Sequence, residues 1–556
     1  MPTPLVSLTL VLACVMLARQ SRVANLAVFD RIAAARYAPV ALGALNALIV
    51  WWVLEFQLNP MPQIQDEAAY LLQAEIFARG RWTEVARPLP EFFAQMHVFT
   101  TPVLASKYPP GTSLFYTPFV VLGFTALAPM LLAATAGAFL FVLARRVTTS
   151  AVALLTWAVW TTAPTALRWQ ATFLSQTLTV VLWLAALYLA LRYRDEQRQW
   201  LVVTLAAVIG LCAITRPLTA MALGIPIGVV IVREVWRARA WRSLALAILT
   251  GTIFVAILPV QNRMTTGDWR LSPLVKYSRE YLPSDFPGFA FDSSRVVAPL
   301  PPDLEQTRQE LFDVRRQHTA DALPVTLLHR GLRSLTIVVA GWRVGLLALV
   351  LIGAIVMPPT GKFGFAMSVG LLLAYGIHSH RAQWSQYYVE AAPVYAFALA
   401  VGVWAVAARL IRGWGAIRSK GLWDTSEPRV AVASITTAFA LIAVWAARSP
   451  TMMAGLHEER AYHRRFAQAL ELVTRESPKA ILFVDYGPTH NAHFSLVRNV
   501  PDLADAKTWI AYERGRDDLR LMRLAPERRA YIYHADEGRL IRLPALAELE
   551  RVVTVR

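Results

Sequence analysis

Long apolar segments constrain this chain more than any other feature. Hydrophobic residues make up 56% of its 556 residues, and charged residues only 17%. A helix needs about 17 to 25 apolar residues to cross a bilayer, and shorter segments suffice where neighbours bury their ends. Such segments lie near residues 4–18, 37–56, 125–143, 150–167, 172–191, 200–214, 217–233, 243–260, 340–357, 363–378, 386–408 and 430–447. We therefore predict an all-α polytopic membrane protein with about twelve transmembrane helices.

The positive charges indicate how these helices are oriented. The formal net charge is +18, and the basic residues lie mostly in short connections rather than in one basic domain. One set of short connections holds 19 Lys or Arg, whereas the opposite set holds only Arg168, Arg216 and Arg381. Because the basic set faces the cytoplasm, we expect the N-terminus on the outer side of the membrane. The charge therefore indicates orientation in a lipid bilayer and not nucleic-acid binding.

Three larger segments then fall on the outer side, which in a bacterium is the periplasmic side of the inner membrane. They are 57–124, 261–339 and the residues from 448 onward. We expect the first two to be long outer loops of a membrane domain that covers residues 1–447.

The C-terminal segment differs in character from the rest of the chain. It contains 18 basic and 15 acidic residues. Short β-rich runs at 480–486, 508–514 and 529–534 are separated by the helix-like stretch DDLRLMRLAP. This alternation predicts a small soluble α/β domain over residues 448–556.

An acidic pair, Asp66-Glu67, follows the second apolar segment by about ten residues. The next residues have helical periodicity, and Gly80 supplies a stop. One face carries Tyr70, Leu71, Ala74, Phe77 and Ala78, while Gln73 and Arg79 lie away from it. We expect an amphipathic helix at the membrane interface with Asp66 at or near its N-cap. Asp66 is then either a helix cap or a functional carboxylate at headgroup level.

A cation follows about forty residues later, in the stretch SKYPPGTSLFYTPF (106–119). Pro109 and Pro110 stiffen the start of another apolar helix, and Lys107 lies at its outer end. A lone interfacial lysine is usually a membrane anchor. Together with the acidic pair, however, Lys107 favours a functional site.

Histidines raise the question of a metal. His97 lies in the same loop as the acidic pair, and an Asp/Glu/His set can hold a divalent ion, although a solvated loop histidine is the alternative. His378 and His380 precede a late apolar segment, but residues two apart point to different faces of a helix. We assign no metal ligand and no cofactor, and we leave a divalent metal open.

These motifs together carry a family resemblance. DEAAYLLQAEIFARGRW, which begins at Asp66, and the later KYPPGTSLFYTPF resemble the first periplasmic loop of GT-C membrane glycosyltransferases. This superfamily includes the protein O-mannosyltransferases of glycosyltransferase family 39 and the aminoarabinose transferases of lipid A. The resemblance covers approximately residues 37–410. It implies a GT-C fold with about a dozen transmembrane helices, interfacial helices in the first outer loop, and a catalytic acidic residue there.

The resemblance also implies roles for individual residues. Asp66 takes the position of the catalytic carboxylate, Glu67 that of its acidic neighbour, and Lys107 that of the cation for the donor phosphate. This chain has Lys-Tyr-Pro-Pro where the aminoarabinose transferases have Lys-Pro-Pro. The stretch 259–291 resembles a loop of uncharacterised bacterial relatives, although ordinary turn formation is the alternative. That likeness rests on Asn262, Thr266, Gly267, Ser272, Pro273, Tyr277, Asp285 and Gly288.

The candidate site combines these residues with polar positions at the outer ends of later helices. We assign catalysis to Asp66 and Glu67. Donor phosphate binding is assigned to Lys107, Arg216 and Arg381, with Arg343 as a further candidate. Substrate binding is assigned to Tyr70, His97, Tyr108, Tyr387 and Glu390.

The resulting hypothesis is an inverting glycosyltransferase that uses a polyprenyl-phosphate-sugar donor. Its acceptor is a lipid, polysaccharide or protein of the cell envelope, and Asp66 acts as general base. A polytopic transporter or lipid flippase is the alternative, but such a protein places ionisable groups near the bilayer midplane. Here the polar residues gather at the outer helix ends instead. A third interpretation is a non-catalytic scaffold whose C-terminal segment binds a partner.

Overall fold

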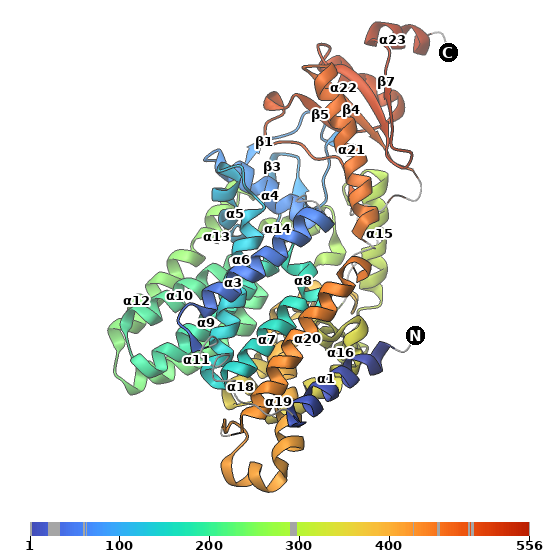
Figure 1. Cartoon of the computed structure of the whole chain (residues 1–556). Coiled ribbons are helices and arrows are strands. Elements are labelled where there is room, and N and C mark those ends of the chain that lie inside the picture. Colours follow the sequence, from blue (N-terminus) through green and yellow to red (C-terminus); the bar gives the residue numbers. More distant parts are fainter. Residues whose placement is uncertain are drawn as a thin grey trace. The chain divides into compact units, whose positions relative to one another are not determined.

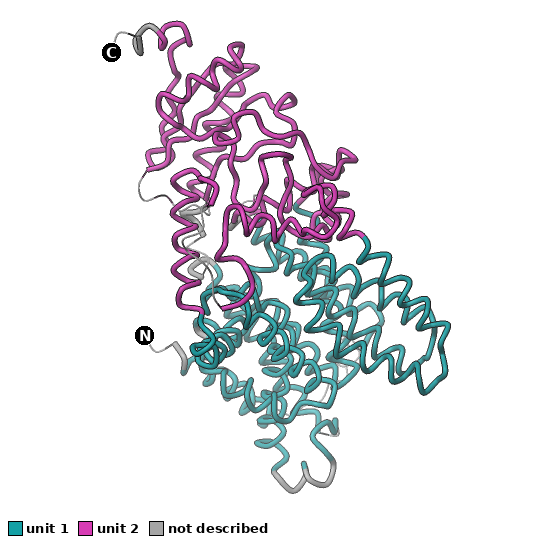
Figure 2. Tube along the Cα trace, turned by 180° about the vertical axis from the view of Figure 1, so that it is seen from behind, with its two compact units in different colours: residues 1–54, 126–256, 319–452 teal, residues 55–125, 257–318, 453–556 magenta. Residues whose placement is uncertain are grey.

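A computed structural model describes residues 3–20, 34–58, 62, 64–289, 297–425, 427–452, 456–487, 490 and 494–554. The chain divides into two compact units, drawn in different colours in Figure 2. The membrane unit comprises residues 1–54, 126–256 and 319–452. The loop unit comprises residues 55–125, 257–318 and 453–556. The loop unit thus combines the first long loop, most of the second and the C-terminal segment, so the structure groups both loops with the tail rather than with the membrane helices.

The membrane unit is built from helices alone among its described residues (Figure 1). Its α-helices are α1 (Thr3–Gln20), α3 (Ala38–Trp52), α6 (Leu127–Val147), α7 (Ser150–Thr162), α8 (Pro164–Gln170), α9 (Ser175–Glu196), α10 (Gln199–Ala213), α11 (Pro217–Arg237), α12 (Trp241–Val255), α16 (Leu323–Val339), α17 (Leu347–Val356), α18 (Pro359–Ala374), α19 (Ala392–Lys420) and α20 (Pro428–Met452). Shorter helical turns are η1 (Val53–Leu58, which continues α3 into the loop unit), η4 (Gly341–Leu346), η5 (Tyr375–Ile377) and η6 (Ser385–Ala391).

Eight helices in the described part of the chain are long and apolar enough to cross a membrane. Two bent helix pairs, α7 with α8 and α16 with the segment 343–356, bring the number to ten. Two shorter apolar helices, Leu5–Gln20 and Gln199–Ala213, match the remaining expected segments. Each of the twelve apolar segments therefore contains a helix, and the chain is a mostly helical, multi-pass membrane protein as the sequence predicted.

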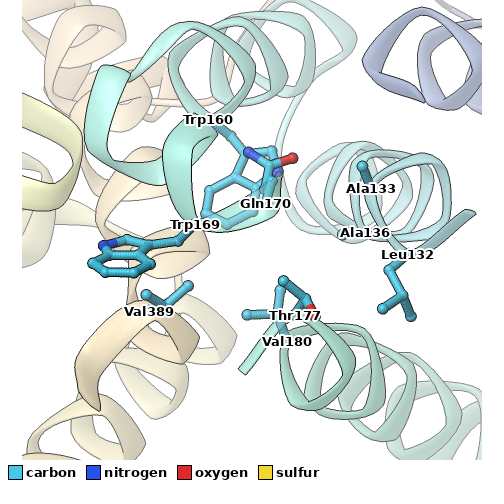
Figure 3. Close-up of a pocket in the computed structure, with 9 residues that line it drawn as sticks. All are labelled: Leu132, Ala133, Ala136, Trp160, Trp169, Gln170, Thr177, Val180 and Val389. Atoms are coloured by element: carbon cyan, nitrogen blue, oxygen red, sulfur yellow. The ribbon is translucent and has the colours of Figure 1, made fainter. Parts of the chain in front are cut away.

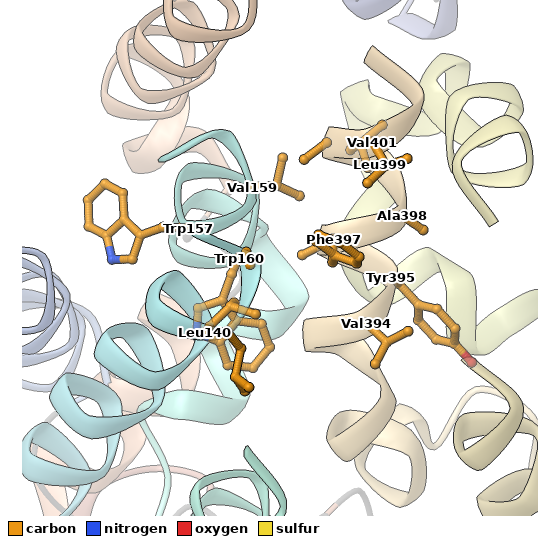
Figure 4. Close-up of a cluster of buried hydrophobic side chains, with 14 of the residues drawn as sticks. Leu140, Trp157, Val159, Trp160, Val394, Tyr395, Phe397, Ala398, Leu399 and Val401 are labelled. Atoms are coloured by element: carbon orange, nitrogen blue, oxygen red, sulfur yellow. The ribbon is translucent and has the colours of Figure 1, made fainter. Parts of the chain in front are cut away.

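The core of the membrane unit contains large aromatic side chains, and in one place two helix backbones approach each other closely. Figure 4 shows Trp157 and Trp160 on α7 and Phe397 on α19, all members of one buried apolar cluster. Helices α17 and α19 approach through glycines, because a Cβ on Gly353 would lie 1.7 Å from the Ala398 carbonyl oxygen. Small residues at a helix crossing permit this close backbone approach. The tight crossing supports the segment that leads into α19.

One helix of the membrane unit lies where the sequence indicated a loop. Residues 261–339 were expected to be an outer loop, but α16 occupies the last part of that range and belongs to the membrane unit. Its Arg330 is 1% exposed. The guanidinium donates hydrogen bonds to the carbonyl oxygens of Tyr375, His378 and His380 at 2.8 to 3.1 Å. Hydropathy did not identify α16 as a membrane helix because the segment contains basic residues.

The loop unit is mixed in secondary structure. Its helices are α4 (Gln65–Ala78), α5 (Gly111–Val121), α13 (Ile257–Thr266), α14 (Pro273–Glu280), α15 (Pro302–Arg316), α21 (Leu456–Glu476), α22 (Asp518–Leu524) and α23 (Leu546–Thr554), with the short turns η2 (Pro90–Phe92), η3 (Pro283–Asp285), η8 (Leu503–Asp505) and η9 (Gly515–Asp517). Strands β1 (Glu84–Val85), β2 (Val98–Phe99) and β3 (Val103–Ser106) form an antiparallel sheet in the order β1-β3-β2. The sequence pattern had not indicated these three short strands.

The C-terminal segment forms the expected small α/β fold. Strands β4 (Ala480–Asp485), β5 (Thr508–Tyr512), β6 (Arg529–His534) and β7 (Arg539–Arg542) lie in the order β5-β4-β6-β7. The first three are parallel, and β7 is antiparallel to β6. Alternate residues of β4 enter two different apolar clusters, Leu482 with Phe466 of α21, and Phe483 with Phe92 of the first loop. This sheet is therefore buried on both faces.

Candidate functional site

The acidic pair lies in the first turn of α4. Ile64 is the N-cap residue in extended conformation, and its apolar side chain makes no capping hydrogen bond. Asp66 is therefore not a helix cap, which removes the simple structural interpretation of this residue. The first turn of a helix nevertheless favours negative charge, because the unpaired N–H groups and the helix dipole are positive there. Gly80 follows the helix with a φ of 73°, in agreement with the predicted stop.

Helix α4 is not the amphipathic helix that the periodicity suggested. Gln73, expected away from the apolar face, is 2% exposed. Its amide donates to the Trp82 carbonyl at 2.9 Å and accepts from the Ser106 N–H at 2.9 Å. A polar side chain that satisfies backbone groups of neighbouring segments is buried at low cost. The helix is thus embedded in the loop unit, and Asp66 is held by protein contacts on both sides.

Asp66 carries the accessible carboxylate of the pair. Its side chain is 32% exposed. The Tyr108 hydroxyl donates to Oδ1, and His97 Nε2 lies 3.8 Å from Oδ2. Burial raises the pKa of Tyr108 well above its usual value, and the charge of Asp66 adds to this effect. Tyr108 therefore stays protonated and fixes one oxygen of Asp66, while the other oxygen faces His97.

Glu67 has a different environment from its neighbour. It is 1% exposed. Its negative charge acts on Arg498 of the C-terminal segment and opposes the lowering of the pKa of Arg498 by burial. Because Glu67 is buried whereas Asp66 is partly exposed, the exposure of the two carboxylates favours Asp66 over Glu67 as the group that meets a substrate.

Lys107 is buried and already has a counterion. Its side chain is 2% exposed, and Nζ lies 2.5 Å from Asp285 Oδ2. The ammonium group also lies over the rings of Tyr108 and Tyr277, at 5.1 and 5.2 Å from their centroids. The sequence placed Lys107 at an exposed helix end, whereas the structure places it in a desolvated aromatic setting with its charge balanced.

The second loop contributes Tyr277 and Asp285 to this cluster. The Tyr277 hydroxyl accepts a hydrogen bond from the His97 N–H at 2.8 Å. His97 has a φ of 69°, a conformation that non-glycine residues rarely adopt and that often occurs at functional sites. The sequence resemblance of the second loop had singled out both Tyr277 and Asp285, but the candidate site had omitted them. Their contacts to His97 and Lys107 were the missing information.

Tyr70 packs against Tyr108, the residue that donates to Asp66. It is 5% exposed, and its ring packs against that of Tyr108 in a tilted arrangement with a centroid distance of 4.7 Å. Its carbonyl oxygen accepts from Ser113 Oγ at 2.9 Å, which joins α4 to α5. Tyr70 therefore positions Tyr108. The structure brings together Asp66, Tyr70, His97, Lys107 and Tyr108 of the predicted site, all within the loop unit.

The described residues contain no group of three or more His, Cys, Asp or Glu side chains arranged to hold a metal ion. In the first loop, Asp66 and His97 approach each other, whereas the carboxylate of Glu67 is engaged with Arg498. Both ring nitrogens of His380 have partners, the His378 carbonyl at 3.0 Å and the Tyr388 hydroxyl. The His378–His380 pair therefore serves the local fold.

The membrane unit contains a second polar cluster, around Arg216 and Glu390. Glu390 in η6 is fully buried, and Arg216 Nε lies 3.2 Å from its Oε1. Thr179 and Thr219 also donate to Oε1, at 2.8 and 3.3 Å. Arg216 donates to the Tyr375 hydroxyl at 2.6 Å. Glu390 therefore forms a buried ion pair with Arg216, and its assignment to substrate binding stays a prediction. Tyr375 is a member of this cluster that the sequence did not reveal.

The other predicted residues of the membrane unit divide into exposed and structural positions. Arg381 is exposed, and Tyr387 is half-buried with its ring 4.3 Å from that of His380. Arg343 is fully buried and donates to the carbonyl oxygens of Val159 and Thr162 at 3.1 and 2.7 Å. These carbonyls lie where α7 ends and the chain bends into α8, so Arg343 satisfies a broken helix end. Its assignment to donor phosphate binding stays a prediction.

The membrane unit also contains a crevice between Trp160, Trp169 and Gln170, which Figure 3 shows. Its volume is about 10 Å³, enough for roughly one water molecule. Small-molecule sites are typically about 300 to 1,000 Å³. The crevice is therefore too small to receive a sugar.

Comparison with known proteins gives one family match. Residues 111–261 match the family described as dolichyl-phosphate-mannose-protein mannosyltransferase. The chain has no match among curated proteins. This matched segment begins at α5, shortly after Lys107 and Tyr108, and continues through Arg216 to the first residues of the second loop.

Similar solved structures include ArnT from Cupriavidus metallidurans in two states. The structure bound to undecaprenyl phosphate has 14% identity, covers 84% of this chain and 86% of that chain, and has a TM-score of 0.43. The apo structure has 14% identity, covers 82% and 83%, and has a TM-score of 0.45. The archaeal oligosaccharyltransferase AglB from Archaeoglobus fulgidus, in complex with an inhibitory peptide and a dolichol-phosphate, has 13% identity, coverage of 81% and 62%, and a TM-score of 0.37.

Proposed function

Because this chain carries a segment that matches the dolichyl-phosphate-mannose-protein mannosyltransferase family, in the GT-C superfamily of membrane glycosyltransferases, we propose that it transfers a sugar from a polyprenyl-phosphate donor. The acceptor is a hydroxyl-bearing molecule of the cell envelope on the outer face of the inner membrane. The observation that carries the proposal is Asp66, an accessible carboxylate oriented by Tyr108 in the same cluster as the Lys107–Asp285 pair.

The proposed reaction is a single displacement. Asp66 takes the proton of the acceptor hydroxyl through Oδ2, the oxygen on the side of His97. The acceptor oxygen forms a bond to the anomeric carbon as the bond from that carbon to the phosphate oxygen breaks. Polyprenyl phosphate leaves with the bonding electrons, so the anomeric configuration is inverted. General-base catalysis of this kind contributes about 10²- to 10⁴-fold.

The cations of the site stabilise the leaving phosphate in this proposal. An ammonium group has three N–H donors, and Asp285 occupies one of those of Lys107, so two remain for phosphate oxygens. Within the membrane unit, Arg216 is held in a fixed direction by Glu390, and Arg381 is exposed. Hydrogen-bond donors held in fixed positions around the charge that develops in the transition state usually make the largest single contribution to catalysis.

The buried Arg216–Glu390 pair also favours one rival function. Paired ionisable groups inside a membrane bundle are typical of transporters and flippases. Glu390, however, lies in the first turns of its membrane segment, Ser385–Gly413. Because a 3₁₀ turn rises about 2 Å per residue, Glu390 lies roughly 10 Å from the first residue of this segment and well before its middle. The position suits interfacial chemistry better than translocation.

The test is a transfer assay in proteoliposomes. Purified protein is mixed with a panel of polyprenyl-phosphate sugars and cell-envelope acceptors, and the product's anomeric configuration is determined by NMR. Transfer with inversion, lost in Asp66→Asn but retained in Asp313→Asn, supports the proposal; Asp313 is an exposed carboxylate paired with Arg316. Movement of a lipid-linked sugar across the bilayer without transfer would establish the flippase instead.

A further inference from the structure

The C-terminal segment packs directly on the catalytic loop of the same unit. Phe92 and Phe93, from the first loop, are 0% and 3% exposed and belong to the apolar cluster on one face of the C-terminal sheet. Phe92 contacts Phe483 of β4, and Phe93 contacts Trp509 of β5, both with edge-to-face geometry at 6.4 and 6.1 Å. Aromatic pairs of this type add specific geometry to apolar burial. The first loop therefore completes the core of the C-terminal sheet.

One stretch of the C-terminal segment, residues 497–500, is hydrogen-bonded to the first loop along its length. Arg87 donates to the Val500 carbonyl at 2.6 Å, and Gln95 donates to the Val497 carbonyl at 3.1 Å. In the opposite direction, Arg498 Nη1 donates to the Pro62 carbonyl at 2.9 Å. Pro62 lies shortly before Asp66 in the sequence. The stretch thus holds the chain where it enters α4, a helix end whose N-cap side chain makes no capping hydrogen bond.

Arg498 is also coupled electrostatically to Glu67, the second residue of the acidic pair. Its Nε and Nη2 are shielded from solvent and make no hydrogen bond with a described residue. The carboxylate of Glu67, which is 1% exposed, is the negative group that acts on this guanidinium. A buried carboxylate is costly unless a positive charge compensates it. Arg498 supplies that charge at the residue that directly follows Asp66.

We propose that Arg498 is a positioning residue for Asp66: it fixes the start of α4 through Pro62 and compensates the charge of Glu67, so that Asp66 alone acts as the base. The inference rests on the proposed function of this site. It gives the C-terminal segment a direct part in catalysis instead of the binding of a separate partner.

Other titratable groups lie near Asp66 and Arg498, and their charges must be considered before the effect of a substitution is predicted. Asp66 is faced by Tyr108 and His97, with the balanced Lys107–Asp285 pair beyond them. Arg498 is also faced by His463, Tyr486 and Tyr512, which are neutral near pH 7 because burial lowers the pKa of the histidine and raises that of the tyrosines. Removing Arg498 or Glu67 therefore changes the net charge near the start of α4 by one unit, in opposite directions.

The two members of the pair should shift the pH dependence of activity in opposite directions. Arg498→Gln leaves Glu67 uncompensated, and a nearby negative charge raises the pKa of Asp66. Glu67→Gln leaves Arg498 uncompensated, and a nearby positive charge lowers the pKa of Asp66. Each single change should move the acid limb of kcat/KM by on the order of one pH unit, upward for the first and downward for the second.

The experiment measures kcat/KM against pH for wild type, Arg498→Gln, Glu67→Gln, the double variant and Arg498→Lys. The double variant and Arg498→Lys are expected to return the acid limb close to the wild-type position. Arg520→Gln is the matched control, because Arg520 joins the same two segments through Glu91 at 3.1 Å on the surface. It should leave the acid limb unchanged.

Equal loss of activity at all pH values in both single variants, with no movement of the acid limb, would overturn the inference and indicate a structural role only. If Arg498→Gln fails to fold, the downward shift in Glu67→Gln still decides between the two outcomes. Failure of the proposed function is a separate result, since Asp66→Asn would then retain full transfer activity.

Discussion

Lys107 Nζ lies 2.5 Å from Asp285 Oδ2, although 178 positions separate the two residues in the sequence. The contact joins the first loop to the second and places a compensated charge pair beside Asp66. Since Lys107 is buried, its ammonium group depends on Asp285 as counterion.

Removing Asp285 should therefore cost stability as well as activity. Asp285→Asn leaves the buried ammonium group of Lys107 without a counterion, a loss that typically amounts to about 3 kcal/mol. We expect a lower midpoint of thermal unfolding in detergent. The double variant Lys107→Met with Asp285→Leu should recover much of that midpoint while transfer activity stays low. If Asp285→Asn unfolds at the wild-type temperature, the ion pair contributes nothing to the fold.

Tyr108→Phe tests the hydrogen bond to Asp66. The Tyr108 hydroxyl stabilises the ionised carboxylate, so its loss should raise the pKa of Asp66 and shift the acid limb of kcat/KM upward by about one unit. The ring remains to pack against Tyr70, so the melting temperature should change little. An unshifted acid limb together with unchanged kcat would show that Tyr108 does not act on Asp66.

Asp518→Asn tests a buried carboxyl of the C-terminal segment. Burial raises the pKa of Asp518 to about 7. The folded state therefore favours the protonated form, so the contribution of Asp518 to stability is fully present below about pH 4 and is lost as the pH rises through about 7. The introduced amide keeps an oxygen that can accept from the Arg514 N–H. Unfolding measured at pH 8 should show a gain of about 2 kcal/mol, and the gain should vanish at about pH 4.

Arg343→Met separates helix support from phosphate binding. It removes the donors for the Val159 and Thr162 carbonyls at the break between α7 and α8. We expect a loss of about 2 kcal/mol in stability, because buried carbonyls are left unsatisfied. The KM for the donor should remain at the wild-type value. A KM that rises strongly in a variant of unchanged stability would support Arg343 as a phosphate ligand.

Much of the fold could be predicted from the sequence because apolar length and strand composition are local signals. The twelve apolar segments and the β-rich runs of the tail all correspond to elements of the expected type. The sequence did not predict helix α16 because an arginine such as Arg330 usually indicates an exposed position. In the fold, Arg330 is buried and donates hydrogen bonds to three backbone carbonyls. Helix α4 was misjudged because Gln73 reads as solvent-facing, whereas it binds two neighbouring segments.

The site could be predicted only in part, for a similar reason. The acidic pair, Lys107 and His97 share one loop, so their proximity follows from sequence order. The partners that decide their roles are distant in sequence: Asp285 balances Lys107, and Arg498 faces Glu67. No periodicity or spacing connects residues so far apart. The difference between an accessible Asp66 and a buried Glu67 emerges only from the fold.

The most direct test of Asp66 as the general base is the single-turnover rate of sugar transfer at saturating donor, compared between wild type and Asp66→Asn. We predict a rate about 10²- to 10⁴-fold lower in Asp66→Asn, with donor binding preserved and with Asp313→Asn at the wild-type rate. Transfer by Asp66→Asn at the wild-type rate would contradict this role.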